Sequence, residues 1–387
     1  MQFSDFDSAA FLRDVWQKKP LLIRNPWTSW HNPLEPDELA GLACEPEVES
    51  RLIVQDDTAA PGALLAEHGP FADDRFARLR ESPWTLLVQA VDHHVPEVAA
   101  LLAPFRFVPN WRIDDVMVSY ASDGGGVGPH FDHYDVFLLQ GLGRRRWRVG
   151  PRCDAATPLL PHDDLRLLAR FEATDEWVLG PGDILYVPPG FAHDGVAVGA
   201  DCMTYSIGFR APSRGELIES WCEDLVEELG DDDRYVDPDL ALQDNPGEIT
   251  AAAIARLHAM ITERLADRAG FARWFGRYSS TRKYPEIDWH PDEPIEAGDL
   301  RGALAEKIPL VRNPASRFAF VREGADDVVL FVDGESFTCS GRSRLLAEQI
   351  CKSDQVTCDP AWQDDDSVTG LIARLINQGS VAFASDD

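Results

Sequence analysis

Positive charge is scarce in this sequence. Of its 387 residues, 36 are Lys or Arg and 66 are Asp or Glu, so the formal net charge is −30. Such a field repels nucleic acids and anionic membrane surfaces and attracts basic partners, although acidity can also serve solubility alone. The composition therefore argues against direct nucleic-acid binding and favours a basic macromolecule as partner.

Long apolar runs and paired cysteine motifs are also missing. No run approaches the length of a membrane span, and the acidic start MQFSDFDSAAFLRDVW lacks the basic and apolar regions of a secretion signal. The seven cysteines are odd in number and show no C-x-x-C spacing, which predicts reduced thiols. We therefore expect a cytoplasmic protein with no disulfide framework and no membrane association.

Three textures follow one another along the chain and predict a mixed α+β protein. Short β-branched and aromatic runs extend from FRFVPNWRIDDVMVSY to MTYSIGFRAP, as in a β-sandwich or barrel. Apolar residues then recur at helical spacing in GELIESWCEDLVEEL and AAAIARLHAMITERLADRAG, either for a dimer interface or for packing on the barrel. The last part alternates strand-like and helical runs, as in a winged helix. We place the three segments at 1–210, 211–297 and 298–387, with the barrel motifs within about 104–212.

A His-x-Asp pair begins the apolar run HFDHYDVFLLQ. Side chains two apart share one face of a strand, so His130, Asp132 and Tyr134 are expected to point together. His193 follows the two turns of GPGDILYVPPGFAH and opens another strand, from which it can reach the pair. Two histidines and one carboxylate form the facial triad of non-haem Fe(II) enzymes, whereas a lone His-x-Asp is more often a capped turn.

Three consecutive arginines follow a Gly-x-Gly turn. In RRRWRV the alternation places Arg145 on the same face as Trp147 and Val149, which is the inward face. A buried guanidinium needs an anion in good geometry, and either an acidic side chain in the barrel or the carboxylate of a ligand can supply it. Beside an open iron site, 2-oxoglutarate fits: its 1-carboxylate and 2-oxo group would chelate the metal, and its 5-carboxylate would meet Arg145.

The runs GGGVGPHFDHYDVFLLQGLGRRRWRVG, GDILYVPPGFAHDG and YSIGFRAP together resemble the bacterial JmjC-type ribosomal oxygenases, in particular the arginine hydroxylases of large-subunit ribosomal protein sixteen. The resemblance is dense from about Pro104 to Pro212, and its layout covers the whole chain. It implies a double-stranded β-helix (cupin, or JmjC jelly-roll) core, a helical dimerisation region in a homodimer and a C-terminal winged helix. It also implies Fe(II) and 2-oxoglutarate as cofactors and O2 as cosubstrate.

The same resemblance assigns site residues, which fall on the motifs quoted above. They are the metal ligands His130, Asp132 and His193, the cofactor-binding residues Arg145 and Thr204, and the substrate-binding residues Asp115, Met117, Tyr134 and Ser206. An inward carboxylate such as Asp115 near an open iron site needs a cation, and the guanidinium of a substrate arginine would provide one.

The activity that the resemblance implies is hydroxylation of an arginine side-chain carbon in a basic large-subunit ribosomal protein. Two rivals use the same core: histidine hydroxylation of another ribosomal protein, and N-methyl demethylation, which releases formaldehyde. A rival of another class is a non-catalytic cupin that binds a partner as a regulator, and the intact ligand set argues against it. The strong acidity indicates that the free ribosomal protein, rather than the assembled ribosome, is modified.

Overall fold

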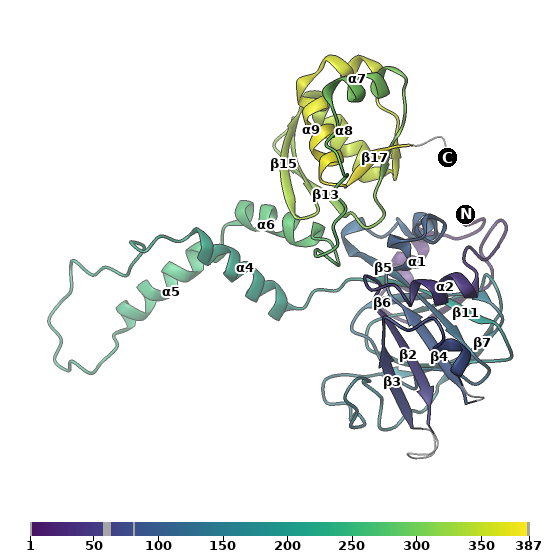
Figure 1. Ribbon diagram of the computed structural model, residues 1–387. Helices are drawn as coiled ribbons and strands as arrows, with labels where there is room; N and C mark the ends of the chain where they lie inside the picture. The colour runs from purple at the N-terminus through teal and green to yellow at the C-terminus, as the bar shows by residue number, and fades with distance from the viewer. Residues whose placement is uncertain (1, 57–62, 80–81, 385–387) are drawn as a thin grey trace. The chain divides into compact units, whose positions relative to one another are not determined.

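The computed structural model describes residues 2–56, 63–79 and 82–384 and divides into two compact units, Met1–Ala211 and Pro212–Asp387 (Figure 1). Each unit has its own hydrophobic core. No helix in the described ranges is both long and apolar enough to cross a bilayer.

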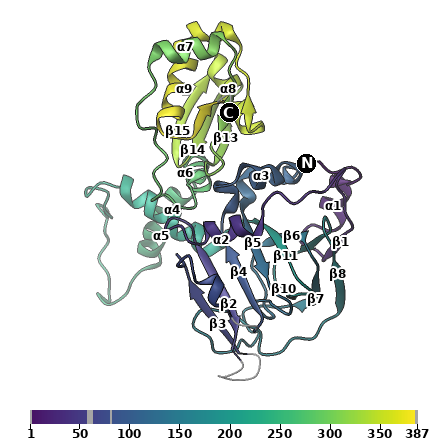
Figure 2. The same ribbon diagram turned by 45° about the vertical axis from the view of Figure 1, so that its right-hand side comes forward.

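Two antiparallel sheets form the first unit (Figure 2). The larger contains β1 (Leu21–Ile23), β2 (Ser50–Gln55), β3 (Leu64–His68), β4 (Trp84–Val88), β5 (Ile113–Ala121), β6 (Asp135–Leu142), β9 (Ile184–Val187) and β11 (Cys202–Phe209). Its strand order is β1-β9-β6-β11-β5-β4-β2-β3. The smaller contains β7 (Arg145–Arg152), β8 (Asp175–Leu179) and β10 (Phe191–Ala197), in the order β10-β7-β8.

Side-chain alternation gives the larger sheet two different apolar faces. On the outer face, Phe137 and Tyr186 join the main core, where both contact the ring of Phe11. On the inner face, Val136 and Leu138 pack with residues of the smaller sheet in a separate cluster. The space between the two sheets is therefore the interior of the predicted barrel, and the double-stranded β-helix core is confirmed.

Short helices complete the first unit. They are α1 (Ser8–Asp14), α2 (Pro36–Leu42) and α3 (Pro96–Ala99), with 3-10 turns η1 (Phe76–Arg78), η2 (Val91–His93), η3 (Ala100–Phe105) and η4 (Asn110–Arg112). Helix α1 begins where the Asp7 side chain accepts a hydrogen bond from the Ala10 amide. Its buried Phe11 places it on the outer face of the larger sheet, which leaves the barrel interior clear.

Helices lead the second unit. They are α4 (Arg214–Glu228), α5 (Ala251–Leu265), α6 (Arg268–Ser280), α7 (Ala297–Ala305), α8 (Gly341–Lys352) and α9 (Asp366–Asn377), with the 3-10 turn η5 (Pro360–Asp364). Helix α4 opens on a capping box in which Ser213 and Glu216 bond each other's backbone amides. The side chains of Thr250 and Asp267 likewise accept hydrogen bonds from the first backbone amides of α5 and α6.

Two three-stranded sheets complete the second unit. One has the order β13-β14-β15 and the other β16-β12-β17; the strands are β12 (Leu310–Arg312), β13 (Phe318–Glu323), β14 (Asp327–Val332), β15 (Glu335–Ser340), β16 (Gln355–Val356) and β17 (Val381–Phe383). Helix α6 packs on β13 and β14, because Gly276 has no side chain where the ring of Phe331 lies. Helix α6 falls in the predicted 211–297 segment yet packs on strands of the 298–387 segment, and the three boundaries stay predictions.

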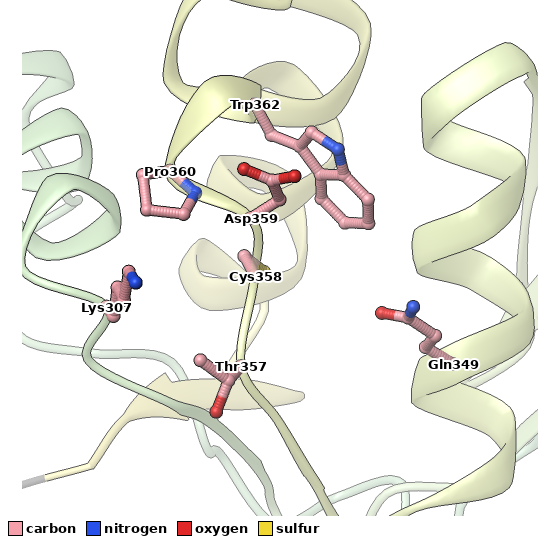
Figure 3. A pocket seen from close by; sticks show the side chains of 7 residues that line it. All are labelled: Lys307, Gln349, Thr357, Cys358, Asp359, Pro360 and Trp362. Carbon is pink, nitrogen blue, oxygen red and sulfur yellow. The ribbon is translucent and has the colours of Figure 1, made fainter.

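The second unit also has an open hollow of about 480 Å³. It is lined by Trp362 in η5, Gln349 on α8 and Lys307 after α7, and the buried Cys358 lies between them (Figure 3). Burial raises the pKa of the Cys358 thiol to about 11, so this cysteine stays protonated and unreactive at neutral pH.

Candidate active site

His130, Asp132 and His193 converge at one end of the barrel. A ligand atom from each lies within 4.8 Å of the other two. The distance from Asp132 Oδ2 is 3.5 Å to His193 Nε2 and 4.0 Å to His130 Nε2. This is the only group of three or more metal-ligating side chains that the described ranges bring together.

The local conformation of the His-x-Asp pair differs from the expected strand. Strand β6 begins at Asp135, and His130 makes only an isolated bridge before it, while His133 and Tyr134 form a bend. A strand would space positions 130 and 132 by roughly 6.6 Å along one line. Positions 131–134 are not in a strand, so the expected strand through this segment was wrong, but the ligand atoms of His130 and Asp132 still meet that of His193.

Main-chain hydrogen bonds join the two histidines. The His130 amide donates to the His193 carbonyl at 3.0 Å, and the His193 amide donates back to the His130 carbonyl at 2.8 Å. The carbonyl of Asp132 accepts a bond of 2.7 Å from the amide of Gly190, in the turn before β10. All three candidate ligands are thus held by backbone bonds between segments far apart in the sequence.

Hydrogen bonding also fixes the tautomer of each imidazole. Nδ1 of His130 lies 2.9 Å from the carbonyl oxygen of Gly128, and Nδ1 of His193 lies 3.0 Å from that of Phe191. A carbonyl can only accept, so each Nδ1 carries the proton and each Nε2 presents its lone pair. Two neutral imidazole nitrogens and one carboxylate oxygen are the donor set that suits Fe(II) and leaves positions open.

Burial lowers the pKa of His193 to about 4, and repulsion by a charged His130 acts in the same direction. An unfolded histidine titrates near 6.5. Between these values the unfolded chain binds more protons than the folded chain, so folding stability from this group is complete above about pH 6.5 and is lost as the pH falls towards 4.

We therefore expect the free energy of unfolding of the metal-free protein to fall by on the order of 2 kcal/mol from this group between pH 6.5 and 4. Urea unfolding at a series of pH values, in the presence of a chelator, measures it. The His193→Gln variant is the control, because it removes the titrating group. Identical pH slopes in the two proteins would contradict the assignment.

A glycine of β10, Gly195, lets the Trp147 ring pack close to the backbone beside His193. The ring centroid of Trp147 is 5.9 Å from that of His193, and a Cβ at Gly195 would lie 2.6 Å from the Trp147 ring. The sequence reasoning did not single out Gly195. A glycine inside an apolar strand, as in HDGVAV, is the signal that marks such an approach.

Arg145 lies inside the barrel without a protein anion. Its side chain is 3% exposed, its guanidinium lies over the Trp147 ring at 5.7 Å, and its Nε and Nη2 have no hydrogen-bond partner. Among the described residues no carboxylate forms an ion pair with it, so an acidic side chain of the barrel does not supply the expected anion. A buried, unpaired guanidinium is unfavourable and is a site prepared for an anionic ligand.

The register places Arg145 at a suitable separation from the triad. On the smaller sheet, Ala197 pairs with Arg145 and His193 pairs with Val149. Four residues of strand span roughly 13 Å, and the long Arg145 side chain can reach across part of this distance. A dicarboxylate that bridges the metal and the guanidinium fits this interval.

Thr204 lies in a buried polar cluster on the inner face. Its hydroxyl donates to Gln140 Oε1 at 3.1 Å, and Gln140 Nε2 donates to the Met203 carbonyl at 3.1 Å. Gln140, which the sequence reasoning missed, thereby orients the Thr204 hydroxyl and leaves its lone pairs available as acceptors.

The four predicted substrate residues lie in different environments. Met117 and Ser206 are register partners on β5 and β11, and Tyr134 is 44% exposed in the bend after Asp132. Asp115 is 5% exposed, and its carboxylate accepts a bond of 2.9 Å from the Ala90 amide. The structure therefore gives Asp115 a backbone contact that the sequence did not indicate, and its predicted role towards substrate stays a prediction.

A double-stranded β-helix with two histidines and a carboxylate at its open end is the architecture of the JmjC-type oxygenases. The family model described as the JmjC domain matches residues 100–217, and the ROXA-like winged helix matches residues 263–382. The chain is 40% identical over 373 residues to ribosomal protein uL16 3-hydroxylase of Escherichia coli K12, covering 95% of each protein. The chain belongs to the JmjC-domain ribosomal oxygenases.

Two further comparisons agree with this family. The chain is 35% identical over 313 residues to a probable ribosomal oxygenase of Haemophilus influenzae, covering 76% of this chain and 74% of that protein. It superimposes with a TM-score of 0.86 on YcfD, a ribosomal oxygenase from Escherichia coli solved in complex with cobalt and 2-oxoglutarate, at 37% identity and 99% coverage of both chains. The predicted family and the predicted C-terminal winged helix are confirmed.

Proposed function

We propose that this protein is an Fe(II)- and 2-oxoglutarate-dependent oxygenase that hydroxylates an arginine side-chain carbon in ribosomal protein uL16. The observation that carries the proposal is the buried, unpaired Arg145 on the same inner sheet face as His193. A metal triad alone would fit many reactions, but a triad with an anion site one strand away selects a dicarboxylate cosubstrate. The names of the relatives above support a ribosomal protein as substrate.

Each residue then has a definite task. His130, Asp132 and His193 would hold the metal through Nε2, a carboxylate oxygen and Nε2, and Arg145 would bind the distal carboxylate of 2-oxoglutarate. Iron and 2-oxoglutarate, when bound, would supply an oxidation in which 2-oxoglutarate is converted to succinate and CO2, one atom of O2 entering the succinate and the other a substrate C–H bond. Because this oxidant does not itself select a carbon, the chain must position the substrate.

Substrate positioning is assigned to four residues. Asp115 pairs with the substrate guanidinium, Tyr134 contacts it from the bend beside Asp132, and Met117 and Ser206 line the path of its methylene groups. Thr204 binds 2-oxoglutarate together with Arg145. The full ligand set favours an enzyme over a non-catalytic regulator, and nothing in the described site favours histidine or an N-methyl group as the reacting group.

The test is incubation of the protein with Fe(II), 2-oxoglutarate and uL16, followed by mass spectrometry of the product. We expect a gain of one oxygen atom on one arginine, with one succinate formed per hydroxylation. Oxidation of a histidine, or formaldehyde release from a methylated peptide, would replace this function by one of its rivals. Conversion of neither 2-oxoglutarate nor uL16 would remove the enzyme assignment.

The helical segment of the second unit supports a homodimer. Ile254, Leu257 and Ile261 follow one another at helical spacing on α5, and they are 56%, 45% and 63% exposed. A row of exposed apolar side chains of this length is unusual on a soluble monomer and marks a protein interface. A second copy of this helix, with the same row, would cover it.

The Leu257→Glu variant is therefore expected to halve the molar mass measured by light scattering after gel filtration. Its leucine is already exposed, so the substitution should leave the fold of the monomer unchanged. Arg256→Glu changes charge on the neighbouring exposed position and should leave the dimer intact. A monomeric wild-type protein, or equal effects of the two substitutions, would reject this interface.

The net charge also bears on where and when the enzyme acts. A chain of formal charge −30 attracts a basic ribosomal protein but is repelled by ribosomal RNA. We place the reaction in the cytoplasm, on the free protein before its assembly. Faster turnover on intact subunits than on free uL16 would contradict this.

A further inference from the structure

The first residue of β6 is a carboxylate with no solvent exposure. Asp135 accepts hydrogen bonds from the hydroxyl of Tyr186 at 2.6 Å, from Nε2 of Gln17 at 2.8 Å and from the guanidinium of Arg112 at 3.1 Å. Gln17 also donates its backbone amide to the Tyr186 hydroxyl at 2.8 Å, which closes the network. Every one of these donors comes from a different segment of the chain.

Each of these segments continues into part of the candidate active site. Asp135 follows directly on the bend of His133 and Tyr134, which Asp132 precedes. Tyr186 precedes the turn in which the Gly190 amide holds the Asp132 carbonyl. Arg112 immediately precedes β5, which carries Asp115 and Met117.

Arg112 extends the network to the end of β11. Its Nε donates to the carbonyl of Arg210, and the Arg210 amide donates back to the carbonyl of Arg112. Its guanidinium also lies over the ring of Trp16 at 5.6 Å. The network therefore ties the strands that carry the substrate side of the site, β5 and β11, to the loop that carries the metal side.

The carboxylate acts from the outer face of the sheet. Phe137, two residues further on, belongs to the outer core with Tyr186, whereas Val136 belongs to the inner cluster. Asp135 consequently points away from the barrel interior and contacts neither metal nor substrate.

We propose that Asp135 is a positioning residue, which fixes the segment from Asp132 to Tyr134 against β5 and β9 and so keeps 2-oxoglutarate turnover coupled to hydroxylation of the substrate. This inference rests on the proposed function for its catalytic consequence, but not for its structural one. When the spacing between oxidant and target carbon is lost, oxidation of 2-oxoglutarate continues without product, because a small misplacement is enough to spoil the reacting geometry.

Asp135→Asn tests the proposal with little change in shape. The new amide nitrogen replaces either Oδ2, which accepts from both Gln17 and Arg112, or Oδ1, which accepts from Tyr186. At least one of these hydrogen bonds is therefore lost in either orientation. Asp183→Asn is the matched control: Asp183 is also buried, and it accepts bonds from Arg24 and from the amides of Asn25 and Gly180, at the opposite end of β9. Each variant removes a buried carboxylate that accepts hydrogen bonds from an arginine and from two further donors.

The first readout is hydrogen–deuterium exchange of the metal-free protein. We expect faster exchange of the amides of His130, Gly190 and His193 in Asp135→Asn, by several-fold, and no such change there in Asp183→Asn. The second readout is the amount of hydroxylated uL16 per succinate, which we expect to fall several-fold in Asp135→Asn only, with the Kd for 2-oxoglutarate within twofold of wild type.

Unchanged exchange at these amides in Asp135→Asn, or equal changes in both variants, would overturn the positioning role. Faster exchange with a wild-type ratio of product to succinate would overturn its link to coupling. If wild-type protein does not hydroxylate uL16 but the exchange result holds, the proposed function fails while the structural inference stands.

Discussion

The Asp132→Ala variant is expected to lose hydroxylation of uL16 by at least about a hundredfold, because changes to outer contacts of metal ligands alone cost 10–100-fold. The variant keeps two imidazoles but no anionic ligand, and removal of the charge that attracts the cation weakens binding. Product measured by mass spectrometry and metal content of the purified protein should fall together. The fold should persist, since the Asp132 side chain is 22% exposed and its backbone bond to Gly190 remains.

His133→Ala is the matched control for that experiment. His133 is the next residue and is exposed, and its ring centroid lies 5.4 Å from that of Phe131, so it is a neighbouring histidine outside the triad. Wild-type activity in this variant, with loss in Asp132→Ala, would identify the ligand. Retained activity in Asp132→Ala would remove the metal assignment and with it the proposed mechanism.

The Arg145→Met variant should show two changes of opposite sign. Loss of a buried charge partner costs about 3–5 kcal/mol, so we expect the Kd and KM for 2-oxoglutarate to rise by roughly a hundredfold to several thousandfold. In the absence of the cosubstrate, however, methionine replaces an unpaired buried cation by an apolar chain of similar length. The ligand-free protein should therefore become more stable.

Calorimetric binding of 2-oxoglutarate and thermal unfolding of ligand-free protein measure these two effects. Arg146→Met is the control, because Arg146 is the exposed neighbour on the opposite face of β7. A weaker affinity accompanied by lower stability would indicate general damage rather than loss of an anion site. An unchanged affinity would place the dicarboxylate elsewhere.

The sequence predicted the barrel strands because they depend on local alternation, whereas the family and the full ligand set came from the resemblance of the joined motifs. Alternation of apolar residues identifies strands and their inward faces, and it correctly placed Arg145 with Trp147 and Val149. The irregular conformation between His130 and Asp135 could not be predicted, because backbone hydrogen bonds to β10 and to the turn before β10 hold this segment. Contacts between distant segments leave no periodic trace in the sequence.

Polar partners were predicted less well than apolar ones. The buried partner of Thr204, Gln140, lies on another strand and becomes visible only through the register of β6 with β11. The hydrogen bond from the Ala90 amide to Asp115 depends on a left-handed backbone conformation at Ala90. A non-glycine residue rarely adopts this conformation, so the sequence does not predict it. Such pairings follow from the tertiary structure, so they require coordinates.

The orientation of both imidazoles depends on main-chain oxygens, those of Gly128 and Phe191. A carbonyl group is present whatever side chain its residue carries, so no single substitution can delete either partner. The orientation of the histidines is therefore sensitive to substitutions that change the backbone conformation rather than to loss of a polar side chain. Gly128, with φ at +79°, is a position where a substitution would do so. Side chains around this centre can therefore be substituted while the two imidazoles keep their orientation.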